Sequence, residues 1–442
     1  MIYSGKKAVV LGLGHSGEAA ARLLREEGAE VTVCESNDSA GLQEKAGTLA
    51  KEGIRVILGA AAETDHSDYD VAVLSPGIDP VVPLVQNVAR KNIPIIGELE
   101  LAFCECACPV AAITGTNGKT TTTELTTFLL QGCGVRTMAS GNIGLPFATA
   151  VRSSHQLDVM VLEVSSFQLE TIRTFRPTVA AWLNLSPNHL DRYPGMTEYR
   201  AAKLRIFENQ AASDTAVINA VNDLPSLAAK VVTFSAVRPD ADFTLDGTFI
   251  CHRGRRILDQ SRTRLPGIHN AENLMAAFAI GHALHVELDD LAAAVGDFSP
   301  PVHRCEFVRD LDGVRWINDS KSTNLDAIEK AIRSQDRPVV LIAGGKDKGF
   351  EFDDLAPLVR ERVRHAVLIG EMKARIARSW DGVPSTLARD LAEAVAVASS
   401  EARAGDVVLF SPGTSSFDMF RNYGERGNQF KSHVNQLTTT AP

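Results

Sequence analysis

The chain has 442 residues, of which 45% are hydrophobic and 22% are charged. This length exceeds what one hydrophobic core usually supports, and the composition is that of a folded globular protein, so several packed domains are expected and general disorder is excluded. The 45 basic and 54 acidic residues give a formal net charge of −9, which argues against a general nucleic-acid-binding surface.

The first segment alternates short apolar runs with helical patterns. KKAVVLGL is followed by a helix expected from Glu18 to Gly28, and then by the runs AEVTVCES, IRVIL and DVAVLSPG. Short apolar runs separated by helices predict a parallel sheet with helices on its faces. A small α/β domain ending near Gly97 is therefore expected.

The motif GLGHSG at residues 12–17 lies between the first predicted strand and the first predicted helix, and Glu35 ends the next strand. Glycines at such a turn let a phosphate approach the helix N-terminus, and the acidic residue completes a dinucleotide-type fingerprint. The motif predicts a site for a nucleotide diphosphate without saying which one. Tight packing of helix on strand, with no ligand, is the alternative.

The second segment opens with PVAAITGTNGKTTTTELTTFLLQG, in which an apolar strand meets a glycine turn and then a helix. The turn directs backbone N–H groups and the helix dipole at phosphate. Lys119 would add positive charge at the β- and γ-phosphates, and Thr120 would place a hydroxyl on Mg²⁺. Ile113 occupies the position of the first glycine of a generic phosphate loop, so only the shorter TGTNGKT form is present. An ATP site is predicted here.

Two further polar residues follow neighbouring predicted strands. Glu163 ends VMVLEV, and TVAAWLNL leads into SPNHLDRYP, which contains His189. Because ligands collect beyond the carboxyl ends of parallel strands, Thr120, Glu163 and His189 are predicted to converge. Oxygen ligands with one imidazole beside phosphate suit Mg²⁺ or Mn²⁺. The alternatives are a solvated edge position for Glu163 and an ordinary loop position for His189.

The remainder of the chain predicts a small antiparallel patch and a further α/β domain. Residues 232–268 alternate like short hairpin strands, and an alanine-rich helix is expected from Asn270 to about Leu284. The runs VRWIND, PVVLIAGG, HAVLIG and DVVLFSPG then resume the αβ alternation. We therefore expect an α/β protein with a Rossmann-like N-terminal domain, a central P-loop ATPase-like domain whose mostly parallel sheet carries the antiparallel patch, and a Rossmann-like C-terminal domain, over residues 1–97, 98–302 and 303–442.

TGTNGKTTTTE and NHLDRYPGMTEYRAAKLRIF resemble the Mur ligases and their folylpolyglutamate synthase relatives, and the resemblance extends over nearly the whole chain. It implies an ATP-dependent amide-bond ligase of peptidoglycan precursor synthesis that works through an acyl phosphate. NHLDRYPGMTEYR and SPGTSSFDMFRNY are most similar to the members that join D-glutamate to UDP-N-acetylmuramoyl-L-alanine, so these two compounds are the expected substrates. The alternatives are a sibling or folylpolyglutamate-type ligase with another amino acid, a non-catalytic ATP-binding regulator, and a nicotinamide-dependent oxidoreductase that binds NAD at the first glycine motif.

The resemblance also implies roles for individual residues. It places ATP at Gly115, Thr116, Asn117, Gly118, Lys119, Thr120, Thr121, Asn270, Asn273, Arg304 and Asp319. It places the UDP precursor at Gly14, His15, Ser16, Glu35, Ser36, Ser75, Pro76, Gly77 and Asn142. It places D-glutamate at Thr323, Lys348, Ser416, Phe417 and Tyr423, of which the last is often phenylalanine in the family. The implied catalytic groups are Lys119, Glu163, His189, Lys203 and Lys321, and the implied metal ligands are Thr120, Glu163, His189 and Lys203.

Two Mg²⁺ sites are expected, with Lys203 carried as a carbamate, and Mn²⁺ is an alternative metal. Cytoplasmic location without an obligate protein partner is also expected. The apolar stretches are shorter than a membrane span, the N-terminal run is too short for a signal peptide, and the seven cysteines are scattered as in reduced proteins.

Overall fold

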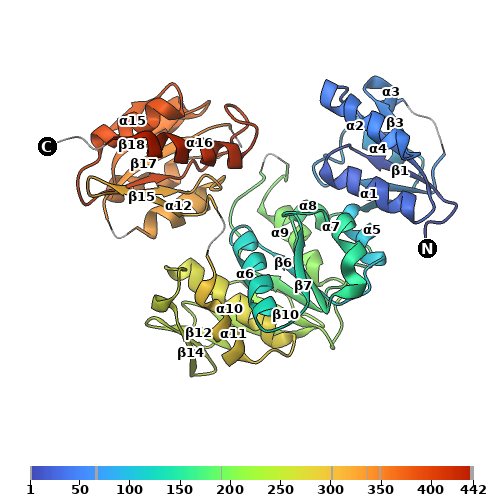
Figure 1. The fold of residues 1–442 in the computed structure, drawn as a ribbon, viewed down its shortest axis with the longest axis horizontal. Helices are drawn as coiled ribbons and strands as arrows, with labels where there is room; N and C mark the ends of the chain where they lie inside the picture. The colour runs from blue at the N-terminus through green and yellow to red at the C-terminus, as the bar shows by residue number, and fades with distance from the viewer. Residues whose placement is uncertain are drawn as a thin grey trace. The chain divides into compact units, whose positions relative to one another are not determined.

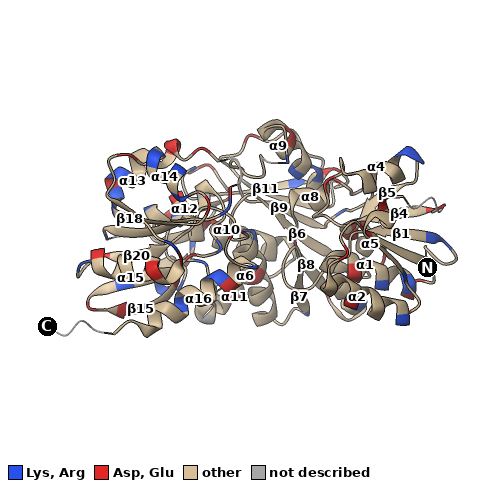
Figure 2. Cartoon of the chain, turned by 90° about the horizontal axis from the view of Figure 1, so that it is seen from above, with Lys and Arg blue, Asp and Glu red and all other residues tan. Residues whose placement is uncertain are grey.

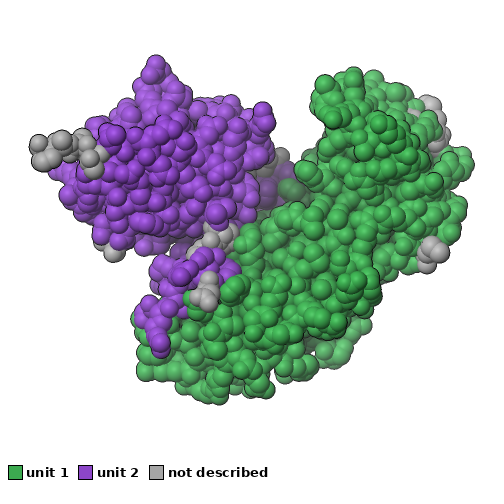
Figure 3. Space-filling view, in the orientation of Figure 1, with its two compact units in different colours: residues 1–184, 197–260, 271–297 green, residues 185–196, 261–270, 298–442 purple. Residues whose placement is uncertain are grey.

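The computed structural model describes residues 2–64, 68–190, 192–299, 302–335, 337–347 and 350–438. Within these residues, three sheets follow one another along the chain (Figure 1). The described chain forms two compact units, coloured separately in Figure 3, which comprise residues 1–184, 197–260 and 271–297, and residues 185–196, 261–270 and 298–442. The fold is α/β with three domains and mostly parallel sheets, as predicted.

The N-terminal sheet is parallel throughout, with the strand order β3-β2-β1-β4-β5 of a Rossmann-like half. Its strands are β1 (Lys7–Leu11), β2 (Glu30–Glu35), β3 (Arg55–Leu58), β4 (Val71–Leu74) and β5 (Ile95–Gly97). Its helices are α1 (His15–Glu26), α2 (Ala40–Lys51), α3 (Ala60–Glu63), α4 (Pro83–Arg90) and α5 (Glu98–Cys104). Helix α1 begins earlier than expected, at His15, because extended Gly14 serves as its N-cap.

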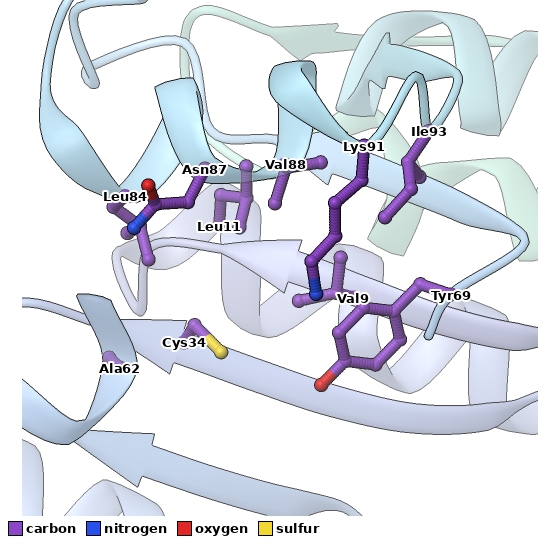
Figure 4. Close-up of a pocket in the computed structure, with 10 residues that line it drawn as sticks. All are labelled: Val9, Leu11, Cys34, Ala62, Tyr69, Leu84, Asn87, Val88, Lys91 and Ile93. Carbon is purple, nitrogen blue, oxygen red and sulfur yellow. The ribbon is translucent and has the colours of Figure 1, made fainter. Parts of the chain in front are cut away.

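One face of this sheet carries a small pocket beneath α3 and α4 (Figure 4). Lys91 extends across it between Val9 and Tyr69 (Figure 4). Most of the lining is apolar, and the full set is Val9, Leu11, Cys34, Ala62, Tyr69, Leu84, Asn87, Val88, Lys91 and Ile93. None of these residues belongs to the predicted UDP site, so the pocket and the first glycine motif are separate features.

The central sheet has the strand order β14-β13-β12-β11-β10-β9-β6-β8-β7. Its strands are β6 (Val110–Thr114), β7 (Thr137–Gly141), β8 (Val159–Glu163), β9 (Val179–Trp182), β10 (Thr215–Asn219), β11 (Lys230–Ser235), β12 (Phe243–Asp246), β13 (Phe249–His252) and β14 (Arg255–Asp259). The predicted antiparallel patch is present but narrower than residues 232–268, because β11 pairs parallel with both β10 and β12, and only β12, β13 and β14 pair antiparallel.

Helices of the central region surround this sheet. They are α6 (Lys119–Gly132), α7 (Phe147–Ala150), α8 (Ser166–Leu169), α9 (Met196–Leu204), α10 (Ile268–Ala283) and α11 (Leu288–Ala294), with 3-10 turns η1 (Val151–Gln156), η2 (Arg205–Phe207), η3 (Gln260–Arg262) and η4 (Val295–Asp297). Strand β6 lies between β9 and β8, so the glycine turn that follows it is in the interior of the sheet and not at an edge. Ligands collect at such positions beyond the carboxyl ends of parallel strands.

The C-terminal sheet has the order β15-β16-β20-β17-β18-β19. Its strands are β15 (Glu306–Leu311), β16 (Val314–Asn318), β17 (Val339–Gly344), β18 (Val363–Ile369), β19 (Ser385–Leu387) and β20 (Val407–Phe410). Strands β15 and β16 form an antiparallel hairpin that the sequence analysis did not anticipate. Asp312 and Gly313 at its turn both have positive φ, 51° and 78°, as an Asp-Gly hairpin turn requires.

Helices cover both faces of the C-terminal sheet. Side chains of α12, α13 and α14 pack on one face, and those of α15 and α16 pack on the other. The bounds are α12 (Leu325–Arg333), η5 (Asp353–Leu355), α13 (Ala356–Arg362), α14 (Lys373–Ser379), α15 (Leu391–Glu401) and α16 (Tyr423–Gln436). This sandwich buries both faces, which explains why the strands read as continuous apolar runs.

Charged residues of both signs occur in both compact units (Figure 2). Some form pairs on the surface, such as Arg22 with Glu18 and Glu52, each at 2.8 Å. Exposed pairs of this kind contribute little stability. Among the described helices, none combines the length and the apolar content that crossing a membrane would need.

Candidate active site

The glycine turn between β6 and α6 is held by one asparagine. Gly118 has left-handed backbone, with φ of +82°, and serves as the N-cap of α6. Asn184 Oδ1 accepts from the Asn117 backbone N–H at 2.9 Å, Asn184 Nδ2 donates to the Asn117 carbonyl at 3.0 Å, and the Thr116 N–H donates to the Asn184 carbonyl at 3.0 Å. The turn is therefore fixed in a shape that presents the N-terminus of α6.

Lys119 lies across this turn. Its Nζ donates to the carbonyl oxygens of Gly115 at 3.1 Å and Thr116 at 2.8 Å. The ammonium group is thus beside the amides that would receive a phosphate, where it could exchange a carbonyl partner for a phosphate oxygen.

Glu163 ends β8 in a buried position and is not at a solvated edge. Its Oε2 accepts from the Thr120 hydroxyl at 2.7 Å, and its Oε1 accepts from Asn142 Nδ2 at 2.8 Å. The structure therefore brings Thr120 and Glu163 together at the carboxyl ends of neighbouring strands. A hydroxyl and a carboxylate side by side form a donor set that fits Mg²⁺.

Lys203, on α9, is a core residue with 1% of its surface exposed. Its Nζ donates to the Gly115 carbonyl at 2.8 Å and lies 4.8 Å from the centre of the Tyr199 ring. Burial, and then the charge of Lys119, lower the pKa of this amine well below its ordinary value, while Glu163 acts in the opposite direction. A lowered pKa favours the neutral amine, which is the form that can react with CO₂, and Lys203 is not the surface lysine that a helix position alone would suggest.

Asn273 packs against the turn. Its Oδ1 accepts from the Thr122 hydroxyl at 3.1 Å, and a Cβ atom added to Gly118 would lie 2.5 Å from the same oxygen. Asn270 lies in the other compact unit, where its Nδ2 donates to the Pro266 carbonyl at 2.8 Å. His189 also belongs to that unit, with a positive φ of 56°. The convergence of His189 with Thr120 and Glu163 therefore stays a prediction.

The predicted UDP residues follow β1, β2 and β4, which are neighbours in the N-terminal sheet. Glu35 accepts from the Leu13 N–H at 3.0 Å, so its carboxylate lies against the first glycine motif. A Cβ atom on Gly12 would lie 2.6 Å from an Ile78 methyl group and 3.0 Å from Ser75 Oγ, so the two loops pack closely. The predicted residues at or just beyond these three strand ends are Gly14, His15, Ser16, Glu35, Ser36, Ser75, Pro76 and Gly77, whereas Asn142 lies in the central domain against Glu163.

Asp319 directly follows β16 in a buried position. Its carboxylate accepts from the Ser411 hydroxyl at 2.8 Å and from the Cys305 N–H at 3.1 Å. Burial raises the pKa of Asp319 to about 6, although these hydrogen bonds and the charge of Arg304 oppose the shift. Arg304 and Asp319 thus share one neighbourhood in the C-terminal domain.

Lys321 follows in the same loop, with its Nζ 5.0 Å from the centre of the Tyr423 ring. Ser416 is buried in the loop after β20, and Phe417 beside it is exposed. Thr323 is half-buried near the start of α12. Lys348 lies outside the described residues. The polar loops after β16 and β20 are adjacent because these strands pair in the sheet.

Three buried or half-buried residues with direct contacts to these loops were missed by the sequence analysis. They are Asn184, Tyr199 and Arg426. The Tyr199 hydroxyl lies 3.3 Å from Thr116 Oγ1. Asn184 stands at the end of a predicted strand, the position that drew attention to Glu163, and this placement was the available signal. Tyr199 and Arg426 lie in helices and carry no comparable signal.

The glycine turn before α6, the buried carboxylate and the buried lysine lie on a three-domain α/β scaffold that three sequence profiles match. Residues 6–97 match the MurD-like N-terminal domain of Mur ligases, residues 113–281 match the Mur ligase middle domain, and residues 303–413 match the Mur ligase glutamate ligase domain. The chain belongs to the Mur ligase family.

Its curated relatives include proteins named UDP-N-acetylmuramoylalanine–D-glutamate ligase. Those of Geobacter metallireducens, Geotalea uraniireducens and Pelobacter propionicus are 45%, 44% and 43% identical to this chain. The alignments cover 99%, 98% and 99% of this chain, and 99%, 98% and 100% of the relatives.

Solved structures of other family members share the fold. The UDP-N-acetylmuramate–alanine ligase MurC of Thermotoga maritima has a TM-score of 0.63 at 19% identity, covering 97% of this chain and 99% of that one. The MurF ligase of the same organism, in complex with ADP, has a TM-score of 0.60 at 15% identity, covering 98% and 96%. The Mycobacterium tuberculosis folylpolyglutamate synthase, complexed with ADP, has a TM-score of 0.58 at 16% identity, covering 74% and 91%.

Proposed function

We propose that this chain joins D-glutamate to UDP-N-acetylmuramoyl-L-alanine with ATP, in peptidoglycan precursor synthesis. The observation that carries the proposal is the cluster of Thr120, Glu163 and Lys203 around the turn before α6. The choice of D-glutamate is supported by full-length relatives of more than 40% identity that bear this activity in their names.

The proposed reaction has two steps. A carboxylate oxygen of the UDP precursor attacks the γ-phosphorus of ATP, ADP leaves, and an acyl phosphate forms. The amine of D-glutamate then attacks the acyl carbon, loses a proton, and phosphate leaves as the amide forms. The amides of residues 115–120 and the ammonium group of Lys119 bind phosphate oxygens and stabilise the charge that develops on them, and Lys321 does the same at the transferred phosphate.

Thr120 and Glu163 would hold Mg²⁺, since their oxygens are adjacent and buried. When bound, Mg²⁺ neutralises charge on the phosphate oxygens. His189 and a carbamate on Lys203 are the further ligands of a proposed second site, with Mn²⁺ as an alternative metal. His189 would also help to bind or deprotonate the attacking amine.

The carbamate forms when the neutral Lys203 amine attacks CO₂ and loses a proton. Burial beside Lys119 supports this step twice, because it lowers the pKa of the amine and so favours the unprotonated form, and because a cation nearby favours the resulting anion. The carbamate would replace the amine that donates to the Gly115 carbonyl with an anion whose oxygens can bind a metal ion.

We propose that each domain receives one substrate. Residues 1–97 would bind the UDP precursor at the loops after β1, β2 and β4, with Asn142 beside its reacting end. Residues 98–302 would bind ATP, together with Arg304 and Asp319 from the next domain. Residues 303–442 would bind D-glutamate at Thr323, Lys348, Ser416, Phe417 and Tyr423. The protein would work in the cytoplasm without an obligate partner.

The test is phosphate release from ATP with UDP-N-acetylmuramoyl-L-alanine and one amino acid at a time. We expect release with D-glutamate and none with L-lysine or meso-diaminopimelate. Release with either of these but not with D-glutamate would assign the chain to a sibling ligase. An absence of release with every amino acid, despite ATP binding, would favour a non-catalytic regulator.

A further inference from the structure

Arg426, on the first turns of α16, is a fully buried arginine with 1% of its surface exposed. Its Nε donates to Ser320 Oγ at 3.1 Å and its Nη2 donates to the Ser320 carbonyl at 2.7 Å. Both Nη atoms donate to the Thr414 carbonyl at 3.3 Å. All of these partners, among the described residues, are neutral oxygens.

The partners of Arg426 belong to loops after neighbouring strands. Ser320 follows β16 and Thr414 follows β20, and these strands pair in the sheet. Gly345 follows β17, the other neighbour of β20, and a Cβ atom there would lie 3.4 Å from Arg426 Nη1. One guanidinium group therefore bonds two loops at the carboxyl ends of the parallel strands and lies close to a third.

Holding a charge in this position is costly. Burial lowers the pKa of Arg426 to about 10, although Asp418 and Asp319 oppose the shift, so the group is still charged at neutral pH. A buried charge with neutral partners is commonly no more stabilising than an apolar side chain of similar volume. The rigid planar fork of arginine does something that an apolar side chain cannot, because it fixes the spacing of the oxygens that accept from it.

Ser320 connects Arg426 to the residues proposed to contact the substrates. Its hydroxyl accepts from Arg426 and donates to the Tyr423 carbonyl at 2.8 Å. Lys321 is the next residue, with its Nζ over the Tyr423 ring. Thr414 similarly lies in the loop that carries Ser416.

We propose that Arg426 is a positioning residue for the ligase reaction, which holds the Lys321 loop and the Ser416 loop at the spacing that the acyl phosphate and D-glutamate require. This inference rests on the proposed function. Arg426 itself would touch neither substrate, and it would act through Ser320 and Thr414.

The test compares Arg426→Lys and Arg426→Ala with wild type in steady-state assays and in binding of the UDP precursor by calorimetry. We expect kcat/KM for D-glutamate to fall by about 100-fold, since misplacement of reacting groups by about 1 Å has that effect. The dissociation constant of the UDP precursor should not change, because its site is in another domain. Guanidinium chloride at low concentration should restore activity to Arg426→Ala, and sodium chloride at the same concentration should not.

Arg364→Lys is the matched control. Arg364 donates to Asp406 at 3.1 Å at the amino ends of β18 and β20, the opposite end of the sheet from the loops. We expect its kinetics to equal those of wild type. Should Arg426→Ala be insoluble, Ser320→Ala replaces it, and we expect a smaller loss, of about tenfold, in the same parameter.

Wild-type kcat/KM in Arg426→Lys would overturn the inference, and so would an Arg426→Ala enzyme that loses precursor affinity together with activity and gains nothing from guanidinium. The proposed function fails separately, if the wild type does not use D-glutamate. In that case the variants are compared with whichever amino acid the wild type accepts.

Discussion

Lys119 and Lys203 donate hydrogen bonds to the same carbonyl oxygen, that of Gly115, at 3.1 Å and 2.8 Å. Two positive charges so close would repel each other, and burial together with the charge of Lys119 lowers the pKa of Lys203. The lowered pKa favours the neutral form of Lys203, which is the form that the proposed reaction with CO₂ requires.

Replacing Lys119 or Glu163 by alanine should lower turnover by at least about 100-fold, the usual loss when one stabilising group at a charged transition state is removed. Calorimetry should find the affinity for UDP-N-acetylmuramoyl-L-alanine intact in both variants, since the proposed precursor site lies in the N-terminal domain. Equal loss of precursor binding in both would contradict the proposed division between domains.

Lys203→Ala should be inactive, and acetate should restore part of its activity by supplying the missing carboxylate group in the space that the side chain leaves. The assay is phosphate release with increasing acetate. Lys230→Ala, at an exposed position on β11, is the control and should be fully active with no response to acetate. Full activity of Lys203→Ala without additive would remove the carbamate from the mechanism.

For single residues, the sequence predicts which side chains lie at the site better than it predicts their burial and hydrogen-bond partners. Thr120 and Glu163 were expected to meet because Thr120 follows one predicted strand of a parallel sheet and Glu163 ends another. The Thr120 hydroxyl lies 2.7 Å from Glu163 Oε2. The lowered pKa of Lys203 could not be predicted, since it arises from burial and from the charge of Lys119, and its partner Gly115 is distant in sequence. Asn184 and Arg426 act on backbone groups of other loops, and such contacts leave no motif.

Two short elements of the first compact unit, α5 and α7, meet through a buried carboxyl group. Glu98, at the start of α5, accepts from the Ala148 N–H at 2.6 Å. Burial raises the pKa of Glu98 from 4.5 to about 7, although backbone hydrogen bonds from Ala148 and Phe147 oppose the shift. Its second oxygen has no hydrogen-bond partner among the described residues. The junction is therefore more stable when Glu98 is protonated.

The sign of the pH effect follows from the raised pKa. The stabilisation is complete below about pH 4.5 and is lost as the pH rises through about 7. Glu98→Gln should remove this loss, which is on the order of 1–3 kcal/mol, and make the variant more stable than wild type at about pH 8. The free energy of unfolding of wild type and Glu98→Gln is measured by urea unfolding at several pH values. Glu44→Gln, at an exposed position, is the control. A wild type whose stability does not fall across this range would contradict the prediction.

The turn before α6 depends on the left-handed backbone at Gly118. Gly118→Ala should weaken ATP binding by at least about tenfold, because a Cβ atom there is strained at φ of +82° and would lie 2.5 Å from Asn273 Oδ1. Gly134→Ala is the control, with φ of +80° and nothing within 4 Å of the added atom, so it should lose stability but not ATP affinity. Equal ATP affinity in the two variants would contradict this role of Gly118.

Element boundaries were less predictable than element types. The sequence predicted strands at residues 232–268 as one antiparallel group, but β11 continues the parallel sheet because its apolar run pairs with β10. The β15–β16 hairpin was missed although Asp312 and Gly313 carry a recognisable turn signal. The prediction had treated this segment as part of the αβ alternation that follows it.

At the scale of the whole molecule, α/β alternation with glycine turns at strand ends was enough to predict three sheets and their mostly parallel pairing. Membership of the Mur ligase family, read from the central motif, is confirmed by profile matches in all three parts of the chain. The residues proposed to bind D-glutamate could not be derived from physical reasoning, because short polar loops after β16, β17 and β20 fit many small charged substrates.

The most direct test of the account is an isotope transfer measurement. UDP-N-acetylmuramoyl-L-alanine labelled with oxygen-18 in its carboxylate is incubated with ATP, Mg²⁺ and D-glutamate, and the released phosphate is analysed by mass spectrometry. An acyl phosphate requires one labelled oxygen to appear in each phosphate released, in step with amide formation. Unlabelled phosphate, or label transfer with no product containing D-glutamate, would contradict the account.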